Sequence, residues 1–201
     1  MKVRFLVGAF AAMFAVTLGL ALVGAEGARD EGGDEARVRA GLQFAKKQGI
    51  DLSYRKRNKE LVGLGSYLVN AVGGCNDCHT APPFTTDPGA FLGAGKQVNV
   101  QCYLAGGTPF GPPPFGLPPN SPVSRNLTPH ADGKPAGLSF DEFDHLMRTG
   151  EDPDNPGQLL RVMPWPVYQE MTSRDLRAIY EYLSSIPGVD AQANACGVPS
   201  I

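Results

Sequence analysis

The sequence lacks the charge pattern of a nucleic-acid-binding protein. Its 201 residues include 18 Lys and Arg against 20 Asp and Glu, a formal net charge of −2. It has no basic stripe interleaved with aromatic residues, so nucleic acid is excluded as the expected partner. Internal repeats and low-complexity tracts are absent too, and apolar residues make up 42% of the chain. This composition is typical of a folded globular protein.

The first 25 residues predict an export signal rather than a folded element. Lys2 and Arg4 give a positive start, Phe5 to Val23 carries no charge, and the small residues Gly24 and Ala25 follow. This is the pattern of a secretory signal peptide, with an uncleaved membrane anchor as the alternative because the apolar run is long. No cysteine lies near the junction, so a lipid anchor is not expected. We expect an exported, periplasmic protein that is membrane-bound only if this segment is retained.

Apolar spacing predicts an all-α fold with long Pro/Gly-rich loops. Residues 26–59 form a charged N-terminal extension with one helix that Gly49 could end. Helical periodicity then recurs over 61–72, 138–148 and 172–185, with Ser139 and Thr172 as N-caps. We assign 60–190 to the main domain and 191–201 to a C-terminal tail.

Residues 80–125 are predicted to form one long loop. Seven prolines fall between Pro109 and Pro122, which excludes a helix or a central strand there. Phe110, Phe115 and Leu117 alternate with these prolines, so we expect the loop to pack on an apolar surface. Loops of this length are usually functional or disordered.

The sequence Cys75-Asn76-Asp77-Cys78-His79 has the C-x-x-C-H spacing of covalent haem attachment. Two thiols three positions apart can each reach one vinyl group of a porphyrin, and the adjacent His79 then lies beneath the iron as an axial ligand. A C-x-x-C pair alone would also suit a redox dithiol or half of a zinc site. A zinc site needs nearby further ligands and a dithiol needs a surrounding parallel sheet, and neither is visible.

Met163 is the candidate for the second axial ligand. Pro164 follows it and disfavours the helical region for Met163, so an extended segment could lay the thioether over a flat ring opposite His79. A thioether suits haem iron, and a Met/His pair raises its reduction potential. The alternative is a methionine that fills a gap in the core.

The other methionines and histidines of the mature chain have ordinary structural explanations. Met147 belongs to an apolar helix face, and Met171 precedes the N-cap Thr172 in the position of a hydrophobic staple. His130 lies in a polar turn, and His145 lies on the polar side of its helix. We therefore expect none of these four side chains to bind iron.

Cys102 and Cys196 remain once the C-x-x-C pair is assigned. In an oxidising compartment such a pair tends to form a disulfide. Two free thiols are the alternative.

Together these motifs resemble the class I c-type cytochromes, in particular the monohaem domains that accept electrons from periplasmic dehydrogenases. The resemblance covers about Glu60 to Pro187. It is carried by the C-x-x-C-H motif and by shorter matches at Gly65, Tyr67, Leu68, Thr80, Asn126-Leu127-Thr128-Pro129, Arg148-Thr149-Gly150, Met163-Pro164-Trp165, Asp175, Leu176, Tyr180, Tyr182 and Leu183. The chain departs from the family at His130, where Asp is common, in the proline-rich insertion and in the Cys102/Cys196 pair.

The resemblance implies a class I cytochrome c fold of short helices around one covalent haem c. It implies that Asn126 lies beside the haem and that Trp165 helps to shield it. The expected function is electron transfer by one iron cycling between Fe(II) and Fe(III), with His79 and Met163 as axial ligands and a dehydrogenase or oxidase as redox partner. The chain would then be no enzyme itself. A haem subunit docked in a larger complex is the first alternative, and a haem enzyme or gas sensor with an open sixth position is the second.

Overall fold

The computed structural model describes residues 33–55, 57–85, 90–111, 123–190 and 196. The chain divides into two units at residue 36, and residues 37 onward make one of them. Within the described ranges the regular structure is helical, and β-pairing is confined to isolated bridges. This confirms the prediction of a helical protein. The predicted signal segment, residues 112–122 of the proline-rich loop and most of the tail lie outside the described residues.

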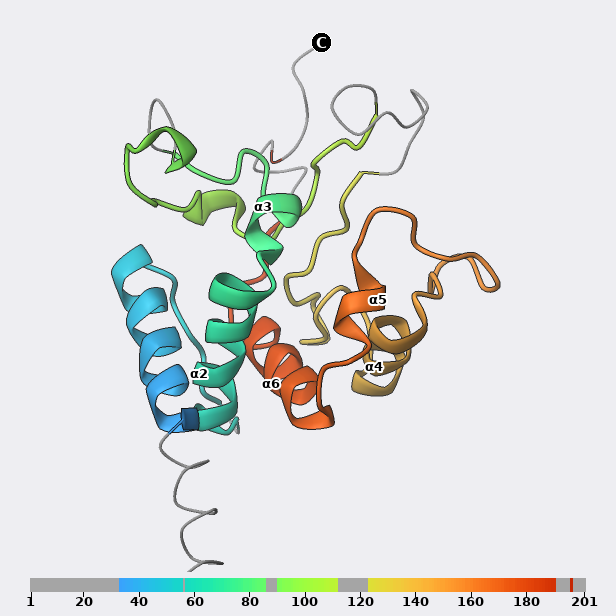
Figure 1. Cartoon of the computed structure of the whole chain (residues 1–201), viewed down its shortest axis with the longest axis horizontal. Coiled ribbons are helices and arrows are strands. Elements are labelled where there is room, and N and C mark those ends of the chain that lie inside the picture. Colours follow the sequence, from blue (N-terminus) through green and yellow to red (C-terminus); the bar gives the residue numbers. More distant parts are fainter. Residues whose placement is uncertain (1–32, 56, 86–89, 112–122, 191–195, 197–201) are drawn as a thin grey trace, which may run out of the picture. The chain divides into compact units, whose positions relative to one another are not determined.

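The described helices follow one another in a simple order (Figure 1). After a helix over 33–48 come α2 (Lys59–Tyr67), the π-helical turn η1 (Leu68–Val72), α3 (Cys75–His79), the 3₁₀ turns η2 (Ala90–Leu92) and η3 (Val100–Cys102), α4 (Phe140–Thr149), α5 (Trp165–Tyr168) and α6 (Ser173–Leu183). No helix in the described ranges is both long enough and apolar enough to span a bilayer.

The two longest of the later helices begin at the predicted caps. Ser139 caps α4 and Thr172 caps α6, and each forms a capping box with the acidic residue three positions on, Glu142 and Asp175. Such caps satisfy the free N–H groups of the first turn and stabilise a helix by about 1 kcal/mol. Gly150 ends α4 in the left-handed conformation that glycine adopts without strain.

Helices α2 and α6 cross at Gly65, which has no room for a side chain (Figure 1). A Cβ atom there would collide with the carbonyl oxygen of Ala178 and lie 2.7 Å from the Cβ of Tyr182. The penalty of a mid-helix glycine, about 1 kcal/mol, is thus accepted for a close approach of two backbones. The resemblance had led us to expect this crossing of first and last helices.

Replacing Gly65 with Ala is expected to destabilise the protein by about 2–3 kcal/mol, because the backbones must separate to admit the methyl group. The measurement is the urea midpoint at unchanged m-value. Gly33→Ala is the matched control, since the helical Gly33 has nothing within 4 Å of a Cβ. It should change stability by no more than about 1 kcal/mol, in the stabilising direction. Equal midpoints for the two variants would contradict the crossing.

The helix over 33–48 packs against α2 through residues 37–48. A Cβ on Gly41 would collide with the carbonyl oxygen of Gly63, and Ser66 Oγ donates to Gly41 O at 2.8 Å. At the C-terminal end, Gln48 is only 4% exposed. Its amide donates to Lys96 O at 2.9 Å and accepts from Val98 N at 2.9 Å. This helix therefore contributes to the core, and Gly49 ends it as predicted.

The continuation of α2 differs from the predicted α-helix. The last turn widens to a π-turn in which Gly73 N donates to Leu68 O at 2.6 Å. The extra residue rotates Val72 out of the apolar stripe, so Val72 is 56% exposed whereas Leu64 and Leu68 are buried. The predicted stripe was right at Leu64 and Leu68 and wrong at Val72.

A polar network lies inside the core where η1 meets α6. Tyr103 Oη donates to Asn70 Oδ1 at 2.6 Å and lies 3.0 Å from Tyr182 Oη. Asn70 Nδ2 donates to Ser66 O at 2.9 Å. Burial raises the pKa of both tyrosines, which therefore stay neutral. The polar atoms of this network have partners, as burial requires.

Candidate functional site

The five residues of the C-x-x-C-H motif form the short helix α3. One helical turn brings Cys75 and Cys78 to the same face because they are three positions apart. Both are free, partly exposed thiols. Buried Asn76 anchors the helix, since its amide donates to Pro83 O at 3.1 Å and its oxygen accepts from Thr80 Oγ1 at 2.9 Å. The helix therefore presents two thiols and His79 from a fixed base.

The environment of the thiols is unlike that of a redox dithiol. Desolvation raises the pKa of Cys75 to about 12 and also raises the pKa of Cys78. The reactive cysteine of a C-x-x-C oxidoreductase has a depressed pKa, which keeps it as a thiolate. The shift here is in the opposite direction.

His79 is oriented by a single hydrogen bond to the backbone. Its Nδ1 lies 2.8 Å from the carbonyl oxygen of Arg125. Because a carbonyl only accepts, Nδ1 carries the proton and Nε2 keeps its lone pair. Desolvation lowers the pKa of His79, which favours the neutral ring. A neutral imidazole whose second nitrogen donates to a carbonyl is the usual arrangement of a metal-binding histidine.

Asn126 organises the turn that carries the Arg125 carbonyl. Its Oδ1 accepts from the backbone N–H and the hydroxyl of Thr128, both at 2.8 Å, and its Nδ2 donates to Val189 O at 2.9 Å. The predicted site residue thus uses its side-chain amide within the protein. The guanidinium of Arg125 forms an ion pair with Asp154 at 2.8 Å.

Met163 lies in a bend just before α5 and is half-buried against the hydrophobic core. The loop is fixed before the bend, because Leu160 N donates to Gly150 O at 2.8 Å. After the bend, Tyr168 Oη donates to Gly73 O at 2.8 Å. Gly73 is two residues from Cys75, so this bond links the Met163 segment to the entrance of α3.

Trp165 holds the same segment from the other side. Its indole Nε1 donates to Leu160 O at 3.1 Å, and its backbone N–H donates to Met163 O at 2.8 Å. The ring lies against Gly150, where a Cβ atom would collide with it. Trp165 therefore supports the Met163 segment against the end of α4.

The remaining methionines and histidines occupy the predicted kinds of position. Met147 is 5% exposed in the core, and Met171 packs partly buried against the same core. His130 is exposed in its turn. His145 is exposed and contacts Glu151 at 2.9 Å.

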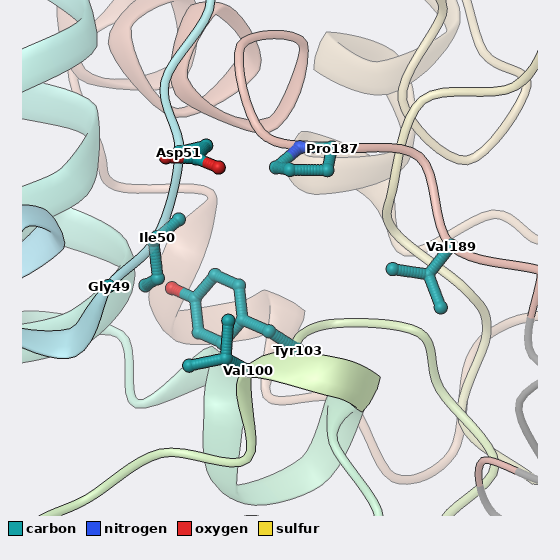
Figure 2. A pocket seen from close by; sticks show the side chains of 7 residues that line it. All are labelled: Gly49, Ile50, Asp51, Val100, Tyr103, Pro187 and Val189. Carbon is teal, nitrogen blue, oxygen red and sulfur yellow. The ribbon is translucent and has the colours of Figure 1, made fainter.

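Cys102 and Cys196 form a disulfide, with Cα atoms 5.4 Å apart. A separate small pocket is lined by Tyr103 and by residues from the end of the 33–48 helix and the start of the tail (Figure 2). Its lining comprises Gly49, Ile50, Asp51, Val100, Tyr103, Pro187 and Val189. None of these is a predicted site residue.

Sequence reasoning missed Arg125 and Tyr168. Arg125 acts through its backbone carbonyl, so its side chain carries no signal of this role. Tyr168 reaches Gly73 across 95 positions, a pairing that spacing alone does not reveal. Only the location of Arg125 beside the matched Asn126 turn could have drawn attention to it.

Comparison with known proteins finds relatives among the cytochrome c subunits of dehydrogenases. The chain is 30% identical over 138 residues to the gluconate 2-dehydrogenase cytochrome c subunit of Pantoea cypripedii, covering 68% of this chain and 26% of the relative. It is 29% identical over 135 residues to the alcohol dehydrogenase (quinone) cytochrome c subunit of Gluconobacter oxydans, covering 66% and 25%. The matching subunit of Gluconacetobacter polyoxogenes is 29% identical over 126 residues, covering 61% and 21%.

The chain thus spans about a quarter of the length of these relatives. No family model and no solved structure matches it. The relatives' names agree with the resemblance carried by the motifs, and they imply haem c as the cofactor.

Proposed function

Since the chain contains a cytochrome c domain like those of dehydrogenase subunits, we propose that it is an exported electron-transfer protein. It binds one haem c covalently through Cys75 and Cys78 in a class I cytochrome c fold. The observation that carries the proposal is the geometry of His79, whose Nδ1–H is committed to Arg125 O at 2.8 Å. Nε2 is thereby left as the donor atom for iron.

The residues around the motif fit a haem. Two free thiols on one face of α3 match the two vinyl groups, and an imidazole with a fixed tautomer follows at once. Met163 is the second axial ligand in this proposal, held in its bend by the bonds of Trp165 to Leu160 and of Tyr168 to Gly73. When bound, the haem supplies one-electron exchange between Fe(II) and Fe(III).

The protein's own contribution is orientation and exclusion of water. His79 keeps one tautomer because the Arg125 carbonyl cannot donate. Ligands on both sides of the ring that do not move between oxidation states keep the reorganisation on electron transfer small. The partly buried Met163 and Trp165 lower the local polarity, which raises the reduction potential together with the thioether ligand.

A dehydrogenase is the proposed redox partner, because the relatives are named as dehydrogenase subunits. In this proposal the chain passes electrons and performs no substrate chemistry itself. Whether it shuttles freely or docks as a subunit, the axial chemistry is the same. Export to the periplasm follows from the predicted signal in residues 1–25, whose retention would anchor the protein to the membrane.

The first test is the visible spectrum of the exported ferrous protein with and without carbon monoxide. A low-spin haem c spectrum that the gas leaves unchanged is expected, because both axial positions are filled. Rapid binding of carbon monoxide would contradict Met163 as a ligand and favour the sensor or enzyme alternative. A protein without any haem absorption would overturn the proposed function.

A further inference from the structure

The Cys102–Cys196 disulfide has no part in the function proposed so far, yet it lies next to the backbone that orients His79. We propose that this disulfide is a positioning element, which holds the Arg125 carbonyl against His79 and thereby tunes the iron. The inference rests on the proposed role of His79 as an axial ligand. It concerns three segments: the strap (residues 102–106), the turn (124–128) and the tail (187–190 and 196).

The strap is attached directly to the haem-binding motif. Gly106 N donates to His79 O at 2.7 Å, and Leu104 N donates to Thr80 Oγ1 at 2.9 Å. Thr80 in turn donates to Asn76 within α3. The strap therefore moves with the C-terminal end of α3.

The strap is also pressed against the turn. Leu127 N donates to Leu104 O at 2.8 Å. A Cβ atom on Gly106 would lie 2.7 Å from the carbonyl carbon of Arg125 and 2.7 Å from Asn126 N. Gly106, with φ +79°, is thus in contact with the peptide group whose oxygen accepts from His79. A shift of the strap moves that peptide group.

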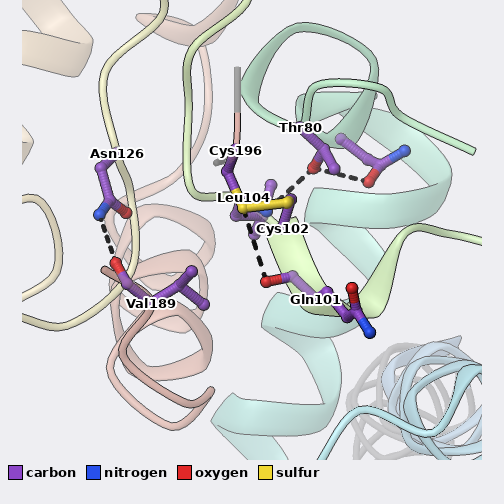
Figure 3. Close-up of a disulfide and its surroundings, with 8 residues drawn as sticks. Thr80, Gln101, Cys102, Leu104, Asn126, Val189 and Cys196 are labelled. Atoms are coloured by element: carbon purple, nitrogen blue, oxygen red, sulfur yellow. Dashed lines mark hydrogen bonds between the residues drawn. A yellow bond between two sulfur atoms is a disulfide. The ribbon is translucent and has the colours of Figure 1, made fainter. Parts of the chain in front are cut away.

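The tail closes the assembly from the far side (Figure 3). Val189 O accepts from Asn126 Nδ2 at 2.9 Å, and Val189 N donates to Thr128 Oγ1 at 3.0 Å. Val189 also packs against Cys102, Ala105 and Cys196, and the disulfide joins tail and strap covalently. The turn is therefore held between two segments that the disulfide prevents from separating.

The consequence for the iron follows from the hydrogen bond of His79. A strong Nδ1–H···O=C bond makes the imidazole a more basic ligand, which stabilises Fe(III) and lowers the reduction potential. Without the disulfide, the tail and strap can separate and the carbonyl is held less firmly. The weaker bond then favours Fe(II), so the potential rises.

The test compares the holoprotein with a Cys102→Ala/Cys196→Ala variant, both full-length and exported. At the wild-type midpoint potential, the ferrous-to-ferric ratio of the variant is expected to be about threefold to tenfold higher, tenfold being 59 mV for a one-electron couple. The Nδ1–H proton of His79, followed by NMR in the ferrous protein, should exchange with solvent at least about tenfold faster, since its bond opens more often. Equal potential and equal exchange would overturn the inference, whatever the change in stability.

Two further variants separate positioning from general stability. Ser139→Ala removes the cap of α4, distant in sequence from the assembly, and should destabilise the protein by about 1 kcal/mol at unchanged potential; a rise in potential equal to that of the double variant would overturn the inference. Asn126→Asp keeps the acceptor for Thr128 and loses the donor to Val189 O, so it should raise the potential even if the double variant does not fold. An unchanged potential for Asn126→Asp would overturn the inference. A wild-type protein without histidine-ligated haem c would instead refute the proposed function.

Discussion

With Cys75 and Cys78 both replaced by Ala, the exported protein is expected to lose all haem on denaturing gel electrophoresis, whereas the wild type keeps it. The thioether bonds are the only covalent link in the proposed attachment, and axial bonds to His79 and Met163 do not survive unfolding. Each single variant retains one thioether and should still stain for haem. The measurement is peroxidase-type haem staining of the gel beside total protein staining.

The matched control for this experiment is the Cys102→Ala/Cys196→Ala variant, which removes two cysteines as well. These two form the disulfide and should leave haem retention on the gel complete. Haem that stays with the Cys75/Cys78 double variant through denaturation would show that attachment does not use the C-x-x-C-H motif. Haem lost from the disulfide variant would show that all four cysteines matter for attachment.

Replacing Met163 with Ala is expected to open the sixth position of the iron. The ferrous variant should bind carbon monoxide readily, and the ferric variant should lose the long-wavelength band of sulfur-ligated haem. Loss of the thioether should lower the reduction potential by on the order of 0.1 V or more, within the range of about 0.8 V that axial ligands cover. Spectroelectrochemical titration and carbon monoxide difference spectra measure both effects.

Met147→Leu is the matched control, because Met147 is a core methionine that is 5% exposed. A volume-conserving swap there should cost less than about 1.5 kcal/mol of stability and leave potential and spectrum unchanged. If Met163→Ala behaved like Met147→Leu, Met163 would be the gap-filling methionine of the alternative interpretation.

Local signals explain which helices the sequence predicted well. Ser139 and Thr172 each precede an apolar stripe with an acidic residue three positions on, so caps and periodicity give the same boundary. The short α3 and α5 lacked such signals. The π-turn at the end of α2 was missed because periodicity assumes a constant turn, and one extra residue moved Val72 out of the stripe.

The site divides in the same way. Cys75, Cys78 and His79 are identified by spacing, which is a local property of the sequence. The Arg125 carbonyl and the contact of Gly106 with its peptide group belong to the backbone, and no side-chain type reports them. The packing of Gly41 on Gly63 was missed for the same reason, since a glycine in a helix does not say which backbone it meets.

The polar network of Asn70, Tyr103 and Tyr182 makes the helix pairing selective. A purely apolar core accepts several packings of similar energy, but a rotation or slip of α6 against η1 would strand these buried polar atoms. Each stranded atom costs about 1–3 kcal/mol, so misaligned packings are disfavoured by more than lost contacts alone. The network involves none of the proposed haem ligands. One alignment of the helices is thus encoded separately from the chemistry that the helices support.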